Sequence, residues 1–200
     1  MAEPVELYFD FSSPYGYFAA ERIDGIAARH GREVIWRPFL LGVAHKLTGG
    51  KAPIGVPLKD AYYKNDFKRS ARFLGVKYRL PSKFPIASIA PSRAFYWIAA
   101  KDPARAKTLA LALYRAFFID DVDISDAENV VSVCAGLGHD SGEVRAALAD
   151  PTVKERFKAE VDRAITGGVF GSPHFIVDGE HFWGADRLDQ LERWLATGGF

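Results

Sequence analysis

Ser13 is the first residue of the chain whose type and position could support chemistry. It directly precedes Pro14, and a serine before a proline is typical of a helix start, with the serine at the N-cap and the proline at the first helical position. A helix cap is the plain structural interpretation. The functional interpretation is that the hydroxyl and the free backbone N–H groups of the helix start hold an anion such as a thiolate.

Two segments near the C-terminus also carry a structural and a functional interpretation. Gly171-Ser172-Pro173 opens a predicted strand, where a proline is often only an edge residue. Trp183-Gly-Ala-Asp186 leads into the last predicted helix, where an acidic residue in the first turn interacts favourably with the helix dipole by about 1 kcal/mol. The backbone N–H groups of such a start would equally suit a ligand carboxylate.

A Gly/Pro-rich segment over 49–57 is flanked by positive charge. Lys46, Lys51 and Lys59 lie in or beside it. Solvated surface charge is the ordinary interpretation of each of these lysines. Three of them around one loop would also suit an anionic ligand.

All these residues lie near the boundaries of predicted strands and helices. The N-terminal part predicts a strand over 5–11, a helix from 13 to about 31 and a strand over 33–38. The C-terminal part predicts a strand over 173–177, a turn at 178–179, a return strand over 180–183 and a final helix. Helical periodicity between them predicts helices over 59–75, 88–100, 104–118, 127–136, 141–148 and 153–167.

This order of elements, βαβ and later ββα, favours an α/β fold with a large all-helical insertion. We expect residues 1–40 and 156–200 to form the sheet domain and residues 41–155 to form the inserted helical domain. The insertion is predicted to contribute no strand to the sheet.

Composition limits the classes of function. The 200 residues are 48% hydrophobic, enough for a real core, and 26 basic against 25 acidic residues argue against general binding to nucleic acid or to an acidic membrane. The single cysteine, Cys134, lies on an apolar helix face and excludes a disulfide framework, a Cys-x-x-Cys pair and a multi-cysteine zinc site.

The remaining features predict a cytoplasmic protein without a metal. The five histidines show no metal-ligand spacing. The N-terminus lacks the apolar run of a signal peptide, and no stretch approaches the roughly 20 apolar residues of a membrane-spanning helix.

Four landmarks in order resemble one family. Phe9-Asp-Phe-Ser-Ser-Pro-Tyr15, Val56-Pro-Leu-Lys59, Gly171-Ser-Pro173 and Trp183-Gly-Ala-Asp-Arg-Leu188 resemble the 2-hydroxychromene-2-carboxylate isomerases and their relatives, the kappa-class glutathione transferases. The resemblance runs from residue 5 to about 195. It implies the thioredoxin-like fold of the bacterial disulfide oxidases, whose Cys-Pro-x-Cys is here Ser13-Pro-Tyr-Gly16.

The resemblance implies that glutathione supplies the thiol that the chain lacks. Its thiolate is expected at Ser13, beside Pro14 and Tyr15. The Ser172-Pro173 bond is expected to be cis, so that the backbone of Ser172 pairs with the cysteinyl part of glutathione.

The resemblance also assigns the remaining contacts. Gly184, Ala185 and Asp186 are expected to bind the γ-glutamyl group, and Trp183 is expected to belong to the same glutathione site. For the substrate, Lys46 best matches the isomerase lysine, and Lys51 and Lys59 add positive charge for its carboxylate. Phe84 falls where an isomerase carries a tyrosine, so it can stack on the substrate but cannot form a hydrogen bond to it.

The function implied is a glutathione-dependent isomerase that interconverts 2-hydroxychromene-2-carboxylate and trans-o-hydroxybenzylidenepyruvate in aromatic hydrocarbon degradation. A kappa-like transferase that conjugates glutathione to electrophiles is the main alternative. A non-catalytic thioredoxin-like binding protein is the second. The relatives' known assembly implies a homodimer.

Overall fold

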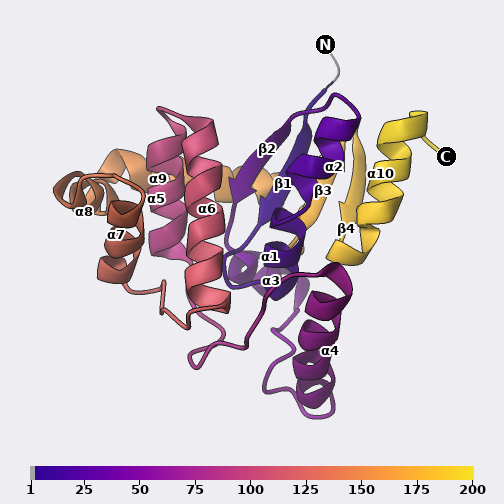
Figure 1. Cartoon of the computed structure of the whole chain (residues 1–200), viewed down its shortest axis with the longest axis horizontal. Helices are drawn as coiled ribbons and strands as arrows, with labels where there is room; N and C mark the ends of the chain where they lie inside the picture. The colour runs from indigo at the N-terminus through magenta and orange to yellow at the C-terminus, as the bar shows by residue number, and fades with distance from the viewer. Residues whose placement is uncertain (1–2) are drawn as a thin grey trace.

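The computed structural model, which describes residues 3–200, contains a mixed sheet of four strands in the order β2-β1-β3-β4. β1 (Val5–Phe9) runs parallel to β2 (Val34–Pro38) and antiparallel to β3 (His174–Val177), which forms a hairpin with β4 (Glu180–Trp183). The hairpin turns at Asp178-Gly179, where both residues have positive φ, at 52° and 81°. The predicted βαβ and ββα units are therefore confirmed (Figure 1).

The first crossover consists of two short helices where the sequence predicts one. α1 (Pro14–Ala20) and α2 (Ile23–Arg29) are separated at Glu21-Arg22, where the Arg22 N–H bonds to Ala19 O, three residues back. Glu21 is held there by Arg115, whose guanidinium donates two hydrogen bonds of 2.8 Å to its carboxylate. Arg115 lies 94 residues from Glu21 along the chain, so the helical periodicity around Glu21 could not predict this contact or the break in the helix.

A helical segment connects β2 to β3. It contains α3 (Leu41–Thr48), α4 (Lys59–Leu74), α5 (Ile89–Ala99), α6 (Pro103–Phe118), α7 (Ala127–Gly136), α8 (Ser141–Ala149) and α9 (Pro151–Thr166). As predicted, none of its residues belongs to the sheet. The expected domain boundary at 155/156 falls inside α9, and the division into two domains stays a prediction.

α3 is the one helix of this segment that the sequence pattern does not separate from the following loop. Its Gly42 and its short length weaken the periodic signal, and it ends at Gly49 in the left-handed conformation, with φ of 70°. Lys46 consequently lies on a helix rather than in the Gly/Pro-rich loop.

The C-terminal part ends in a short 3₁₀ turn, η1 (Ala185–Arg187), that continues into α10 (Leu188–Thr197). α10 packs against α2 and η1 packs against α1. Within residues 3–200, no helix combines the length and the apolar character that crossing a lipid bilayer requires.

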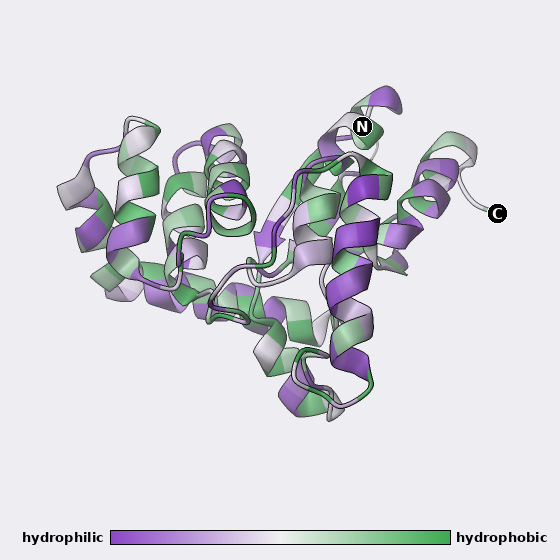
Figure 2. Ribbon diagram, turned by 60° about the horizontal axis from the view of Figure 1, so that its bottom comes forward, coloured by the Kyte–Doolittle hydropathy of each residue, from purple (hydrophilic) through white to green (hydrophobic). Residues whose placement is uncertain are grey.

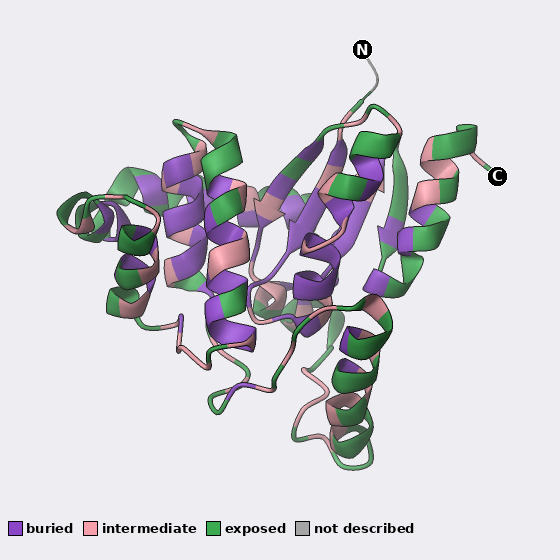
Figure 3. Cartoon of the chain, in the orientation of Figure 1, coloured by how far each residue is buried: buried purple, intermediate pink, exposed green. Residues whose placement is uncertain are grey.

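One continuous core joins the sheet to the helices. The buried strands lie at the centre of the molecule, whereas α4 projects from the body and is largely exposed (Figure 3). Hydropathy follows the same division, since many residues of α4 are hydrophilic (Figure 2). Aromatic rings make up much of this core: Phe9 contacts Phe11, Trp36, Phe95 and Tyr114, with ring centroids 5.2–6.0 Å apart.

The side chain of Phe9 therefore packs β1 against both α5 and α6. Phe9→Ala should lower the free energy of unfolding by about 3–5 kcal/mol, because its side chain is fully buried and a large cavity would remain. Phe73→Ala is the matched control, since Phe73 on α4 is 86% exposed and its loss should cost less than about 0.5 kcal/mol. Urea unfolding of both variants checks this, and equal losses would contradict the placement of the core.

Candidate active site at the start of the first helix

Ser13 caps α1 as predicted. Its hydroxyl oxygen accepts a hydrogen bond of 3.0 Å from the Gly16 N–H, and the residue is only 5% exposed. The hydroxyl proton is donated to Ser172 O at 2.9 Å. Ser13 therefore joins the start of α1 to the loop before β3. A hydroxyl has one proton, so donating it to a ligand requires turning it away from Ser172 O.

The Ser172-Pro173 bond is cis, as the resemblance implies. The Ser172 hydroxyl oxygen accepts a hydrogen bond of 2.9 Å from the Asp10 N–H. Ser172 N–H donates to no acceptor in the described part of the chain. The loop thus offers one backbone donor beside Ser13, and its carbonyl keeps a second lone pair for a ligand N–H.

Gly16 occupies a position with no room for a side chain. A Cβ atom there would lie 2.8 Å from both Ser172 Oγ and Tyr114 Oη, closer than real Cβ contacts. Two hydroxyls fill the space that a second cysteine would need. The site is therefore built without protein sulfur, and the remaining thiol, Cys134, is buried with its pKa raised to about 12 by that burial.

Asp10 is a site component that the sequence analysis does not single out. Its side chain lies at the end of β1 and is 4% exposed, and burial raises its pKa above the usual value for an aspartic acid. Its main-chain oxygen accepts hydrogen bonds from the Ser13 N–H at 2.9 Å and from the Tyr114 hydroxyl at 3.0 Å. An acidic residue between Phe9 and Phe11, in an otherwise aromatic segment, was the available signal.

The Trp183–Asp186 segment lies beside α1 and the cis-proline loop, because η1 packs against α1 and the Gly184 N–H donates to Pro173 O at 3.0 Å. The indole of Trp183 covers Gly171, because a Cβ atom on Gly171 would lie only 2.0 Å from the indole Nε1. The indole also packs edge-on against Phe170, with ring centroids 4.8 Å apart. Gly184 has φ of 112°, which suits glycine. Ala185 is buried, whereas Asp186 is exposed.

Tyr15 connects the site to the projecting helix. Its hydroxyl donates to the Asp66 carboxylate on α4, and its ring packs against Phe18 and Phe67. Burial and the neighbouring carboxylate both raise the pKa of this phenol. Tyr15 therefore stays protonated and acts as a donor to Asp66.

The predicted substrate residues are not brought together by direct contacts. Lys46 lies on α3, Lys51 in the connection to α4 and Lys59 at the first position of α4, and all three are exposed. None of these three lysines forms an ion pair with a carboxylate within residues 3–200. The lysines that do so there are Lys64, Lys83 and Lys107.

Phe84 is half-buried and belongs to an aromatic cluster. Its ring packs near Phe67, Phe117 and Phe118, with centroids 6.2–6.4 Å apart. The segment that follows it reaches the site, because the Ile86 N–H donates to the Ser12 hydroxyl at 3.1 Å. A hollow of about 620 Å³ beside α4 is lined by none of the predicted site residues.

Gly16→Ala should perturb this site through its crowding. The new methyl group would press on Ser172 and Tyr114 and lower the free energy of unfolding by about 1–3 kcal/mol. Gly25→Ala on α2 is the matched control, because a Cβ atom there meets nothing within 4 Å and alanine favours a helix by up to about 1 kcal/mol. Thermal unfolding measures both, and a neutral Gly16→Ala would show that the two hydroxyls move freely.

Comparisons with known proteins identify the family and the fold. The model of the DsbA-like thioredoxin domain family matches residues 4–196. A 2-hydroxychromene-2-carboxylate isomerase of Sphingobium xenophagum is 27% identical over 98% of this chain and 99% of its own length. Glutathione S-transferase kappa 2 of Caenorhabditis elegans is 28% identical over 96% of this chain and 91% of its own length.

A solved 2-hydroxychromene-2-carboxylate isomerase has the same fold, with a TM-score of 0.87 at 26% identity, over 96% of this chain and 94% of that structure. The expected resemblance and thioredoxin-like fold are confirmed, and because the named relatives are enzymes, so is the expectation of an enzyme. The chain belongs to the DsbA-like thioredoxin domain family, and it is similar to 2-hydroxychromene-2-carboxylate isomerases and kappa-class glutathione transferases.

Proposed function

We propose that this protein is a glutathione-dependent isomerase that interconverts 2-hydroxychromene-2-carboxylate and trans-o-hydroxybenzylidenepyruvate. The observation that carries the proposal is the hydrogen bond between Ser13 and Ser172 O, which places a hydroxyl at a helix start beside a cis-proline loop. The chain supplies no thiol there, and its one cysteine is buried elsewhere. A ligand thiol at this position fits both facts.

The residues present fit glutathione. Ser172 offers a backbone N–H and a carbonyl lone pair for the cysteinyl unit, in the manner of an added strand. Ser13, Pro14 and Tyr15 form the helix start under the sulfur. Gly184, Ala185 and Asp186 would face the γ-glutamyl group beside Trp183, with the exposed Asp186 carboxylate, which lies 3.7 Å from the Arg187 guanidinium, pairing with its ammonium.

Glutathione would supply reversible thiolate addition to a conjugated double bond, which lets that bond rotate before the thiol leaves unchanged. Ser13 would turn its proton from Ser172 O to the sulfur and so favour the thiolate. Lys46, Lys51 and Lys59 would bind the substrate carboxylate, and Phe84 would pack on its ring. Position 16 is a glycine, so no protein thiol competes with glutathione there.

A kappa-like glutathione transferase remains the alternative, since a kappa transferase is 28% identical to this chain. We further propose that the enzyme acts in the cytoplasm, as a homodimer, in aromatic catabolism.

The fate of glutathione separates the two activities. An isomerase interconverts the absorbances of chromene and pyruvate forms with catalytic amounts of glutathione and leaves the total thiol unchanged. We expect this result. Stoichiometric loss of thiol when an aryl halide is added as electrophile, with 2-hydroxychromene-2-carboxylate left unchanged, would instead assign a transferase.

Ser13→Ala should abolish most of the turnover and leave the fold intact. As a cap, the hydroxyl contributes about 1 kcal/mol to stability. As a donor to a thiolate, the same hydroxyl stabilises the anion by about 1.4 kcal/mol or more. Removing the hydroxyl would therefore raise the pKa of the bound thiol by about 1.

Ser92→Ala is the control, because Ser92 is equally buried but bonds within α5, to Ser88 O at 2.7 Å. Thiolate absorbance of bound glutathione and turnover are measured together. If Ser13→Ala matches Ser92→Ala in both, Ser13 is only a helix cap.

A further inference from the structure

Asp10 is the one acidic side chain that is buried among residues 3–200. Both its carboxylate oxygens accept hydrogen bonds: Oδ1 from the Ser12 N–H and the Ser88 hydroxyl, each at 2.8 Å, and Oδ2 from the Leu41 N–H at 2.7 Å. No lysine or arginine pairs with it in the described structure. A buried carboxylate without a cation depends on such donors, so each of them matters.

The three donors come from three helix starts. Ser12 directly precedes the N-cap of α1, Leu41 is the first residue of α3, and Ser88 is the N-cap of α5. Two of these helices lie in the helical segment between β2 and β3. α6 reaches the same residue, since the Tyr114 hydroxyl donates to Asp10 O.

The main chain of Asp10 holds both halves of the candidate active site. Its carbonyl accepts the Ser13 N–H, and its N–H donates to the Ser172 hydroxyl oxygen. The helical segment therefore contacts, through one residue, the two serines that we assign to glutathione.

We propose that Asp10 is a positioning residue through which α3, α5 and α6 set the geometry and the electrostatic field at position 13. The proposal deepens the proposed function, because it names what tunes a thiolate at that position. It is also testable without glutathione.

The direction of the effect follows from charge and geometry. At a pH where Asp10 is ionised, loss of the Ser88 donor leaves its negative charge less compensated and loosens the turn that carries Ser13. Both changes disfavour a second anion at position 13 and raise the pKa of a thiol placed there. Two other titratable groups face Asp10. A positive charge on His45 of α3 would favour the carboxylate form of Asp10. Tyr114 of α6 is buried, and this burial raises the pKa of its phenol.

The first experiment places a thiol at the site itself. In the Ser13→Cys protein, the introduced thiol is the only one that titrates well below the buried Cys134, whose pKa is about 12. Adding Ser88→Ala should raise the pKa of the introduced thiol by about 0.5 or more. At a pH below that pKa, the fraction of thiolate should fall about threefold. Thiolate absorbance against pH gives the value.

Ser92→Ala in the same background is the matched control. It removes an equally buried hydroxyl from α5 that does not touch Asp10. We expect the pKa of the introduced thiol to stay within about 0.2 of the parent in that protein. Equal pKa values in the two double variants, whatever their melting temperatures, would overturn the proposal.

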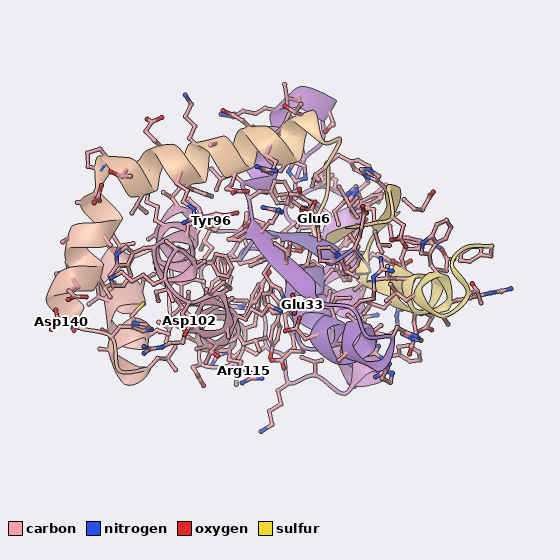
Figure 4. All side chains as sticks on the ribbon, turned by 90° about the horizontal axis from the view of Figure 1, so that it is seen from above. Glu6, Glu33, Tyr96, Asp102, Arg115 and Asp140 are labelled. Carbon is pink, nitrogen blue, oxygen red and sulfur yellow. The ribbon has the colours of Figure 1, made fainter. Side chains whose placement is uncertain are left out.

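A second pair repeats the test on another helix, in case Ser88→Ala folds poorly. Tyr114→Phe removes the hydroxyl on Asp10 O, and Tyr96→Phe removes a similarly buried hydroxyl that donates to Pro38 O at 2.8 Å. Figure 4 shows Tyr96 between α9 and the strands. Only Tyr114→Phe should raise the pKa of the introduced thiol, and parity between the two would contradict the proposal.

The same variants with serine at position 13 test the link to glutathione. Ser88→Ala should raise the KM for glutathione at least threefold over Ser92→Ala. A rise in the pKa of the introduced thiol without any glutathione binding by the native protein would support the role of Asp10 and reject the proposed function. No change in either measurement would reject the role of Asp10.

Discussion

A buried carboxylate at the end of β1 is the constraint on which the surrounding structure depends. Asp10 lies where the sheet, the first helix and the helical segment meet, and water is excluded there. A charge in such a place costs several kcal/mol unless donors surround it. Ser12, Leu41 and Ser88 supply those donors, so the starts of α1, α3 and α5 are drawn to one point.

This convergence explains how an insertion far from the strands in sequence contributes to the site. The aromatic contacts of Phe9 with Phe95 and Tyr114 fix α5 and α6 on the sheet by burial, which has little directional preference. The hydrogen bonds to Asp10 add direction, since each requires a particular donor at a particular angle. Burial therefore brings the helices to the sheet, and the polar contacts set their register beside Ser13.

The same crowding separates this site from a dithiol site. In a Cys-Pro-x-Cys site, the second cysteine needs space at the position of Gly16, and here Ser172 Oγ and Tyr114 Oη lie too close to any Cβ atom. Both hydroxyls are held by the main chain of Asp10. The side that carries the predicted substrate lysines is more exposed by comparison, because α4 packs mainly against α1 and its lysine at position 59 is exposed. A densely packed Ser13 site beside an exposed segment that carries lysines suits the proposed reaction.

Local pattern determined much of this protein from the sequence alone. Alternation with a period of two marked the strands, helical periodicity marked α4 to α9, and the Ser13-Pro14 cap marked the start of α1, because each signal depends on residues close together in the chain. Ser13 was found in this way, whereas the resemblance to the isomerases pointed to the Ser172-Pro173 loop. The break between α1 and α2, the short α3 and the role of Asp10 were found in neither way. They depend on partners that only the tertiary structure brings together, such as Ser88 and Tyr114, which lie 78 and 104 residues from Asp10 along the chain.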